Sequence, residues 1–273
     1  MKTFVLYHAH CADGFASAFA AWCALGDSAE YIPVSYDEPP PEMPAGSRVF
    51  IVDFSYPREV LEALWKRTSL LTILDHHKTA EAALAGLGYA HFDMEKSGAV
   101  LAWEHFQGQG NCIGPVPMLL LYVQDRDLWR WELPNSHDVS AGLALVPRDF
   151  ETWHIMADEV NAIARLVAQG QIVRKAHAAL IAQICDHAHA DVLATKPVET
   201  PCIVVNTPVL QSECCHELLQ RFPGMAVAAA FFHGEQKLTW SLRSRKGGAD
   251  VSAIAQQFGG GGHACAAGFT EEL

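Results

Sequence analysis

Acidic side chains follow apolar runs at four places in the first half of the sequence. They are Asp13, Asp53, Asp75 and Asp125. Ligands of an open parallel sheet bind at the carboxyl ends of its strands, so we expect these carboxyls to face one crevice. Any one of them alone is equally well explained as a turn former or a helix cap. Four together would repel one another unless protons or divalent cations offset the charge.

Histidines accompany these aspartates. His8 and His10 precede Asp13, and His76 and His77 follow Asp75 directly. A mixture of carboxylate and imidazole ligands suits Mn²⁺, Mg²⁺, Fe²⁺, Zn²⁺ or Co²⁺. Two such cations, about 3.5–4 Å apart, activate a water for attack on phosphorus and neutralise the phosphate oxygens. The pattern therefore favours metal-dependent hydrolysis of a phosphate ester.

Strands and helices must alternate to bring these residues together. Short apolar runs predict strands at 4–7, 49–52 and 70–74, and helical patterns cover 15–25, 58–66 and 97–105. This alternation indicates an α/β fold with a doubly wound, mainly parallel sheet. Prolines make 37–44 a loop. We expect three segments: a catalytic metal-binding domain at 1–155, a helical connector at 156–196, and a smaller α/β lobe at 197–273, with the substrate cleft between the lobes.

The charge, apolar runs and cysteines of the sequence limit which partners and which cell compartment we expect. The 273 residues carry a formal net charge of −12, which disfavours sequence-specific binding of duplex DNA but leaves short nucleotides open as substrates. No apolar run approaches the roughly 20 residues that span a bilayer, and the N-terminus does not read as a signal peptide. The eight cysteines form no C-x-x-C pair. We therefore expect a cytoplasmic protein with reduced thiols and no membrane association; a homodimer stays open.

The sequence resembles the DHH phosphoesterases. Asp75-His76-His77 is similar to the signature tripeptide, and four further segments occur in the order that family shows. They are His8 to Gly14, Val52-Asp53, Gln124 to Asp127, and Gly259 to His263 with Ala266 to Phe269, the last being similar to the glycine-rich motif of the DHH-associated C-terminal domain. The resemblance extends over nearly the whole chain.

The resemblance implies a site with two divalent metal ions, Mn²⁺ being favoured. Asp53 would bridge both and His77 would act on the phosphate or the leaving group, so these are the expected catalytic residues. The expected metal ligands are His8, Cys11, Asp13, Asp53, His76 and Asp125. Two alternatives remain. Cys11 stands where many relatives have aspartate, and either its thiolate binds metal or His10 or water does. Asp127 competes with Asp125, which we prefer because it directly follows the run 118–123.

The resemblance also implies where substrate is bound. The expected substrate-binding residues are Arg243, Gly260, Gly261, Gly262 and His263, the glycines acting as an anion-binding nest. Trp129 and Trp131 either stack a base or pack in the core. The favoured function is hydrolysis of short single-stranded nucleic acids or nucleotides, as in oligoribonucleases. Alternatives are a cyclic (di)nucleotide phosphodiesterase, a pAp-type phosphatase, and a catalytically impaired nucleotide-binding regulatory protein.

Overall fold

The chain folds as two compact units. The computed structural model describes residues 1–36, 38–197 and 199–272, and its contacts separate Met1–Arg174 from Lys175–Leu273. The predicted division at 1–155, 156–196 and 197–273 stays a prediction, as does the cleft between the lobes. Asp37, the first residue of the predicted loop, lies outside the described residues, and 38–44 form neither helix nor strand.

A parallel sheet forms the centre of the first unit. Its strands are β1 (Thr3–His8), β2 (Ala29–Val34), β3 (Arg48–Val52), β4 (Leu70–Asp75) and β5 (Ala90–Phe92), in the order β2-β1-β3-β4-β5. Every pairing in this sheet is parallel. The inner strands β1, β3 and β4 are short apolar runs because helices cover both faces of the sheet. The predicted α/β fold with a mainly parallel sheet is confirmed.

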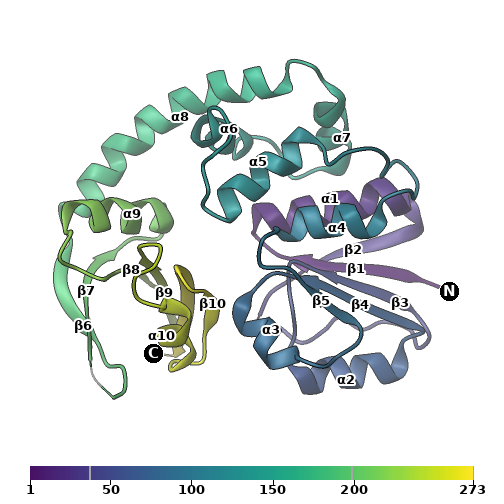
Figure 1. Cartoon of the computed structure of the whole chain (residues 1–273), viewed down its shortest axis with the longest axis horizontal. Coiled ribbons are helices and arrows are strands. Elements are labelled where there is room, and N and C mark those ends of the chain that lie inside the picture. The colour runs from purple at the N-terminus through teal and green to yellow at the C-terminus, as the bar shows by residue number, and fades with distance from the viewer. Residues whose placement is uncertain (37, 198, 273) are drawn as a thin grey trace. The chain divides into compact units, whose positions relative to one another are not determined.

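Two pairs of helices cover the two faces of this sheet (Figure 1). One face carries α1 (Ala12–Leu25) and α4 (Gly98–Phe106), and the other carries α2 (Arg58–Arg67) and α3 (Lys78–Leu84). Alternate strand residues supply the two cores: Val5 and Phe50 pack with Phe19 of α1, whereas Leu6 and Ile51 pack in a separate cluster with α2. This is the doubly wound arrangement that the sequence predicts.

Further helices extend the first unit. They are the short 3₁₀ helix η1 (Gly26–Ser28), α5 (Met118–Asp127), α6 (Ser136–Leu143) and α7 (Phe150–Asp158). The predicted connector helix is α8 (Ala162–Cys185), which begins in the first unit and ends in the second. None of the described helices combines the length and the apolar composition needed to cross a membrane.

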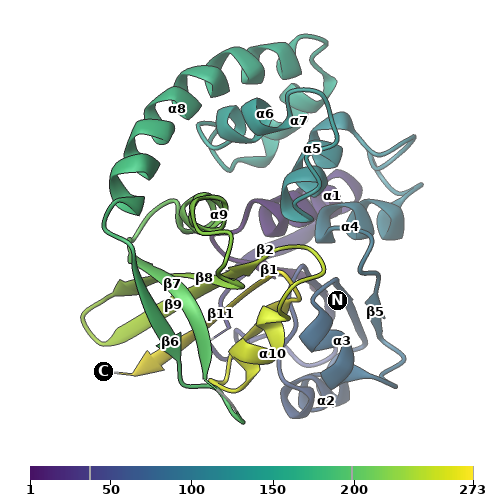
Figure 2. The same ribbon diagram turned by 60° about the vertical axis from the view of Figure 1, so that its left-hand side comes forward.

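The second unit is a smaller α/β structure with a mostly antiparallel sheet (Figure 2). Its strands are β6 (His189–Leu193), β7 (Thr200–Asn206), β8 (Val227–His233), β9 (Lys237–Ser244), β10 (Gly261–His263) and β11 (Ala266–Glu272), in the order β10-β11-β9-β8-β7-β6. Helix α9 (Gln211–Arg221) packs on one face and α10 (Val251–Gln256) on the other, each over its own apolar cluster. The smaller α/β lobe is confirmed.

Candidate metal centre

Asp53 lies where strand β3 ends. Its carboxylate is 1% exposed, and its backbone adopts the left-handed conformation, with φ of 55°. The Asp53 N–H donates to Leu74 O at 2.9 Å, which holds the turn against strand β4. Because β3 and β4 are parallel neighbours, Asp53 and the His76 that follows β4 emerge at the same edge of the sheet.

The ring of His76 meets three carboxylates at this edge. Its Nε2 lies 3.1 Å from Asp53 Oδ1, 3.6 Å from Asp13 Oδ2 and 3.4 Å from Asp127 Oδ2. The side chain of His76 is 1% exposed, so water contributes little to screening these charges. Asp13, Asp53 and His76 each offer a ligand atom, and these atoms lie within 4.8 Å of one another. This group of two carboxylates and one imidazole suits a divalent cation.

A second group of ligand atoms contains Asp53 again. His8, Cys11 and Asp53 bring an imidazole nitrogen, a thiol and a carboxylate oxygen within 4.8 Å of one another. His8 Nδ1 and Asp53 Oδ2 face each other at 3.5 Å, and neither atom has a hydrogen-bond partner among the described residues. Buried polar atoms normally have partners, so a shared cation fits this arrangement. The side chain of His10 is exposed and belongs to neither group.

Helix α4 fixes Asp13 from the opposite side. Gly98 N–H donates to Asp13 Oδ2 at 2.6 Å, and Ala99 N–H donates to Oδ1 at 3.1 Å. The positive end of the helix dipole thus faces this carboxylate. A Cβ on Gly98 would lie 2.6 Å from Asp53 Cβ and 3.0 Å from Asp13 Oδ2, so glycine is required there. Gly98 is not among the residues predicted from the sequence; its only signal there is a small residue following Ser97 at the helix start.

His77 is oriented by Asp75. Its Nδ1 lies 2.7 Å from Asp75 Oδ1, and the same carboxylate accepts the Ser55 hydroxyl at 2.5 Å on Oδ2. Asp75 also accepts the backbone N–H groups of His76 and His77. Because the Asp75 carboxylate bonds Nδ1, proton transfer between His77 and a ligand would involve Nε2. Asp75 is therefore a positioning residue for His77, a role the sequence analysis did not assign.

The charges of the cluster perturb its own protonation. Burial opposes a charged His76, but its hydrogen bond to Asp53 and the charges of Asp127 and Asp13 raise its pKa to about 10. Burial, with the charges of Asp53 and Asp127, raises the pKa of Asp13 well above its usual range. Burial alone would raise the pKa of Asp53, yet the imidazoles of His76 and His8 lower it. Protons therefore offset part of the negative charge, and cations must displace them to bind.

Burial and neighbouring charges also shift the pKa values of Cys11 and His77. Burial, and then the charges of Asp53, Asp127 and Asp13, raise the pKa of the Cys11 thiol well above its ordinary value. A thiolate there requires a cation beside it. Burial disfavours a charged His77, but Asp75 raises the pKa of this imidazole above its ordinary value. His77 is therefore suited to hold a proton that a leaving oxygen needs.

Asp127, and not Asp125, joins the cluster. The apolar run 118–123 that precedes Asp125 belongs to helix α5 and not to a strand. Asp125 accepts the N–H groups of Glu132 (2.9 Å) and Leu133 (3.2 Å), so its carboxylate serves the following turn. Asp127, further along the same helix, faces His76 instead. The ligand role of either residue stays a prediction.

The predicted substrate-binding residues lie together in the second unit. His263 of β10 pairs with Ala266 of β11, which pairs with Arg243 of β9. Arg243 donates to Ser212 Oγ at 2.6 Å and to Leu242 O at 2.8 Å. Their role in substrate binding stays a prediction.

The glycine run is not an open nest. Gly259 and Gly260 donate their N–H groups to Gln256 O and Ala255 O, which ends helix α10. Gly261 and Gly262 belong to strand β10, and a Cβ on Gly262 would lie 2.6 Å from Ala266 O. Close packing against β11 accounts for Gly260 and Gly262, and the N–H groups of Gly259 and Gly260 already have carbonyl partners; binding of substrate by these glycines stays a prediction.

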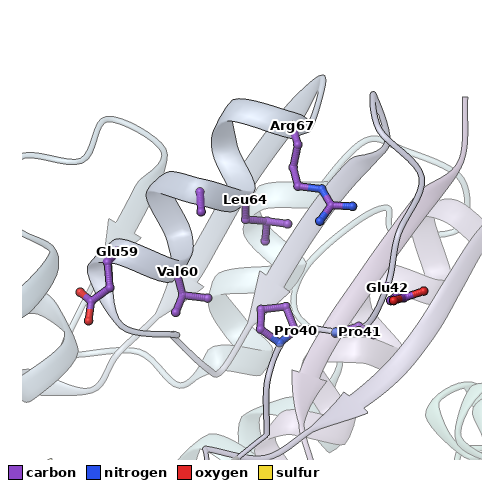
Figure 3. A pocket seen from close by; sticks show the side chains of 8 residues that line it. Pro40, Pro41, Glu42, Glu59, Val60, Leu64 and Arg67 are labelled. Carbon is purple, nitrogen blue, oxygen red and sulfur yellow. The ribbon is translucent and has the colours of Figure 1, made fainter.

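A separate hollow lies between helix α2 and the proline-rich segment (Figure 3). Its volume is about 390 Å³, and Pro40, Leu64 and Arg67 are among the residues lining it. Arg67 donates to Met43 O at 2.9 Å, so its guanidinium ties the segment to the helix. The hollow contains no member of the cluster described above, and we assign it no chemistry.

A viral protein resembles this chain in sequence. No protein-family model matches the sequence. An uncharacterized protein of Acanthamoeba polyphaga mimivirus is 28% identical over 283 residues, covering 97% of this chain and 66% of that protein. The chain thus spans just under two thirds of this relative.

Solved structures extend the comparison. One similar structure is the DHH domain of a member of the s1p family of ribosomal proteins, with a TM-score of 0.57 and 13% sequence identity. The match covers 100% of this chain and 83% of that domain's chain. Another is an exopolyphosphatase-related protein from Bacteroides fragilis, with a TM-score of 0.54 and 14% sequence identity. The match covers 98% of this chain and 86% of that protein's chain. At such identities the likeness establishes the fold alone: this chain has the fold of a DHH-domain protein.

Proposed function

We propose that this chain is a DHH-family phosphoesterase that hydrolyses phosphodiester bonds in short oligonucleotides or nucleotides. The observation that carries the proposal is that several ligand groups share Asp53, one of them with His8 and Cys11 and another with Asp13 and His76. A shared carboxylate between two sites is what a two-metal hydrolase requires. The DHH-like fold and the order of the sequence motifs support the same family.

Each group of residues has a part in the reaction. His8, Cys11 and Asp53 would hold one divalent cation, and Asp13, Asp53, His76 and Asp127 the other. Bound there, the cations would lower the pKa of a water and neutralise the phosphate oxygens. Helix α4 keeps Asp13 in place through two N–H donors, and Asp75 orients His77 so that its ring delivers a proton to the leaving oxygen. Mn²⁺ is the proposed cation.

The residues of the second unit complete the proposal. Arg243 and His263 lie on neighbouring ladder positions either side of Ala266, which allows both to contact one phosphate. We assign them to binding of the substrate beyond the scissile bond. The net charge of −12 supports a short substrate over a long duplex, which would gain no general attraction.

Turnover with defined metals tests the proposal. Purified protein freed of metal by chelation is supplied with Mn²⁺ and assayed on a labelled dinucleotide. We expect turnover that Asp53→Asn lowers by at least about 100-fold, because even outer partners of metal ligands are worth about 10–100-fold. Tight nucleotide binding without turnover in Mn²⁺, Mg²⁺, Fe²⁺, Zn²⁺ or Co²⁺ would contradict the enzyme and favour a regulatory binding protein.

A further inference from the structure

A cavity of about 410 Å³ opens beside the metal centre within the first unit. Cys11, Asp13 and Asp127 form its polar side. Its other walls include four apolar residues: Val139 and Leu143 of α6, Val146 of the segment between α6 and α7, and Trp153 of α7. The volume lies in the range of pockets that hold small organic ligands, about 300–1,000 Å³. The catalytic roles assigned above use the polar side and leave the apolar walls without a function.

Two guanidinium groups line the same cavity and are fixed in place. Arg126 Cζ lies 4.7 Å above the ring of Trp129, a cation–π contact that holds the side chain on the turn after α5. Arg148 donates to His10 O at 3.2 Å, next to the Cys11 ligand. Guanidinium groups bind phosphate oxygens in a paired, planar fashion. The cavity thus combines anion-binding groups near the metals with an apolar wall.

A buried donor at the wall points to a polar ligand atom. Trp153 is 2% exposed, and its Nε1 has no hydrogen-bond partner among the described residues. Its ring is held by Phe15, with centroids 5.0 Å apart at 75°, and by Phe19 at 5.9 Å. A buried N–H without an acceptor costs free energy, so an acceptor that reached this N–H would bind favourably.

We infer that this cavity is the subsite for a nucleoside of the substrate, which rests on the function proposed above and narrows its substrate class. The base lies against Leu143, Val146 and Trp153, and Arg126 and Arg148 bind the phosphate next to it. A nucleobase supplies both the apolar face and the acceptor atoms that this wall lacks. Inorganic polyphosphate has no apolar part and would leave the apolar wall of the cavity in contact with water. The substrate is therefore a nucleotide ester and not a purely inorganic phosphate chain.

The faces of Trp129 and Trp131 are engaged by other groups of the same unit. Trp131 stacks on His137 with centroids 3.8 Å apart at 13°, and Arg126 lies over both indoles. Their function is to hold Arg126, so the base is placed against Trp153 and not between these two rings.

Equilibrium binding tests the subsite without any turnover. AMP, ribose 5-phosphate and inorganic phosphate are titrated calorimetrically into the full chain in EDTA. Burial of the base against the apolar wall should make AMP bind at least about 10-fold more tightly than ribose 5-phosphate. Ala144→Phe, which fills the cavity from its exposed rim, should abolish that preference. Leu145→Phe, the exposed neighbour that does not line the cavity, is the control. AMP binding no tighter than ribose 5-phosphate, or unaffected by Ala144→Phe, overturns the inference.

Kinetics in Mn²⁺ separate this subsite from the metal centre. Ala144→Phe should lower kcat/KM for a dinucleotide at least about 10-fold, mainly through KM. Methyl p-nitrophenyl phosphate, whose activated leaving group needs little binding, should change less than about 2-fold. Equal losses on both substrates, or none on either, overturn the subsite. If the wild-type chain hydrolyses neither substrate, the proposed function fails and the binding experiment alone decides the subsite.

Discussion

Asp53 is the residue on which both candidate metal sites depend. Its positive φ places it in a region that non-glycine residues occupy at a cost of about 1–3 kcal/mol, and strain of this kind concentrates at functional sites. Packing of Gly98 against its Cβ and the bond from its N–H to Leu74 O hold the conformation. Asparagine tolerates the same backbone region, so Asp53→Asn tests charge more than shape.

The two neighbouring aspartates of helix α5 should separate metal binding from stability. Asp127→Asn removes a charge that faces His76, so we expect at least about 10-fold weaker Mn²⁺ binding with little loss of stability. Asp125→Asn replaces one of the two oxygens that accept backbone N–H groups with an NH2 donor and should cost about 1–3 kcal/mol of unfolding free energy with Mn²⁺ affinity retained. Calorimetric titration and urea unfolding measure both. The reverse pattern would restore Asp125 as the ligand.

The pair Asp75 and His77 should appear in the pH profile. The Asp75 charge raises the pKa of His77, and a proton donor fails as the pH rises through its pKa. Asp75→Asn removes that charge, so the alkaline fall of kcat/KM should move to lower pH. Ser55→Ala, which keeps the charge, should move it much less. A fall that stays in place, or moves to higher pH, would remove His77 from the role of proton donor.

At the scale of elements, the start of helix α4 is fitted closely to the acidic cluster. An added methyl at Gly98 would meet Asp53, Ser17 and Asp13 within 3.0 Å. We expect Gly98→Ala to lower the unfolding free energy by about 1–3 kcal/mol and to weaken Mn²⁺ binding, because overpacking displaces the carboxylates. Gly88→Ala, where an added Cβ meets nothing within 4 Å, is the matched control. Equal effects at the two positions would contradict the close fit.

The elements also explain what the sequence could and could not predict. Runs such as 49–52 and 70–74 are recognisable because both of their faces are buried, and the residues after them indeed share one edge. The run 118–123 has a similar apolar texture but belongs to a buried helix, and periodicity cannot distinguish the two. The preference for Asp125 over Asp127 as a metal ligand stays a prediction, although it is Asp127 that contacts His76. Gly98 was missed because its importance lies in contacts with residues distant in the sequence.

At the scale of the whole molecule, each unit has cores of its own, so a ligand of one unit should stabilise that unit first. Mn²⁺ at 100 times its dissociation constant stabilises by about 2.7 kcal/mol. We expect slower hydrogen exchange in α1 and α4 and no change in β8 and β9, measured by mass spectrometry. Protection confined to the second unit would place the cation elsewhere.

Stabilisation by Mn²⁺ should also depend on pH. Without metal, the proton on His76 stabilises the fold; that contribution is full below the ordinary histidine pKa of about 6.5 and is lost as the pH rises toward about 10. Cations compete with this proton, so the gain in Tm on adding Mn²⁺ should increase as the pH rises from about 6 to 8. A gain that shrinks over this range would contradict the proposed ligand set.

The architecture of two α/β units was predictable from the sequence. The coupled protonation of His76 and its neighbouring carboxylates was not, because it depends on distances that no sequence pattern encodes.

The borders of the parallel sheet bear on self-association. Val34 O accepts the Ala9 N–H, so Val34 faces β1 and the preceding Pro33 turns its backbone outward along edge strand β2. Proline offers no donor there, and the opposite border, β5, is only 3 residues long. Neither border offers a long row of open amides onto which a second molecule could add a strand. Fibril-like growth through this sheet is thereby discouraged, and any homodimer would have to form through another surface.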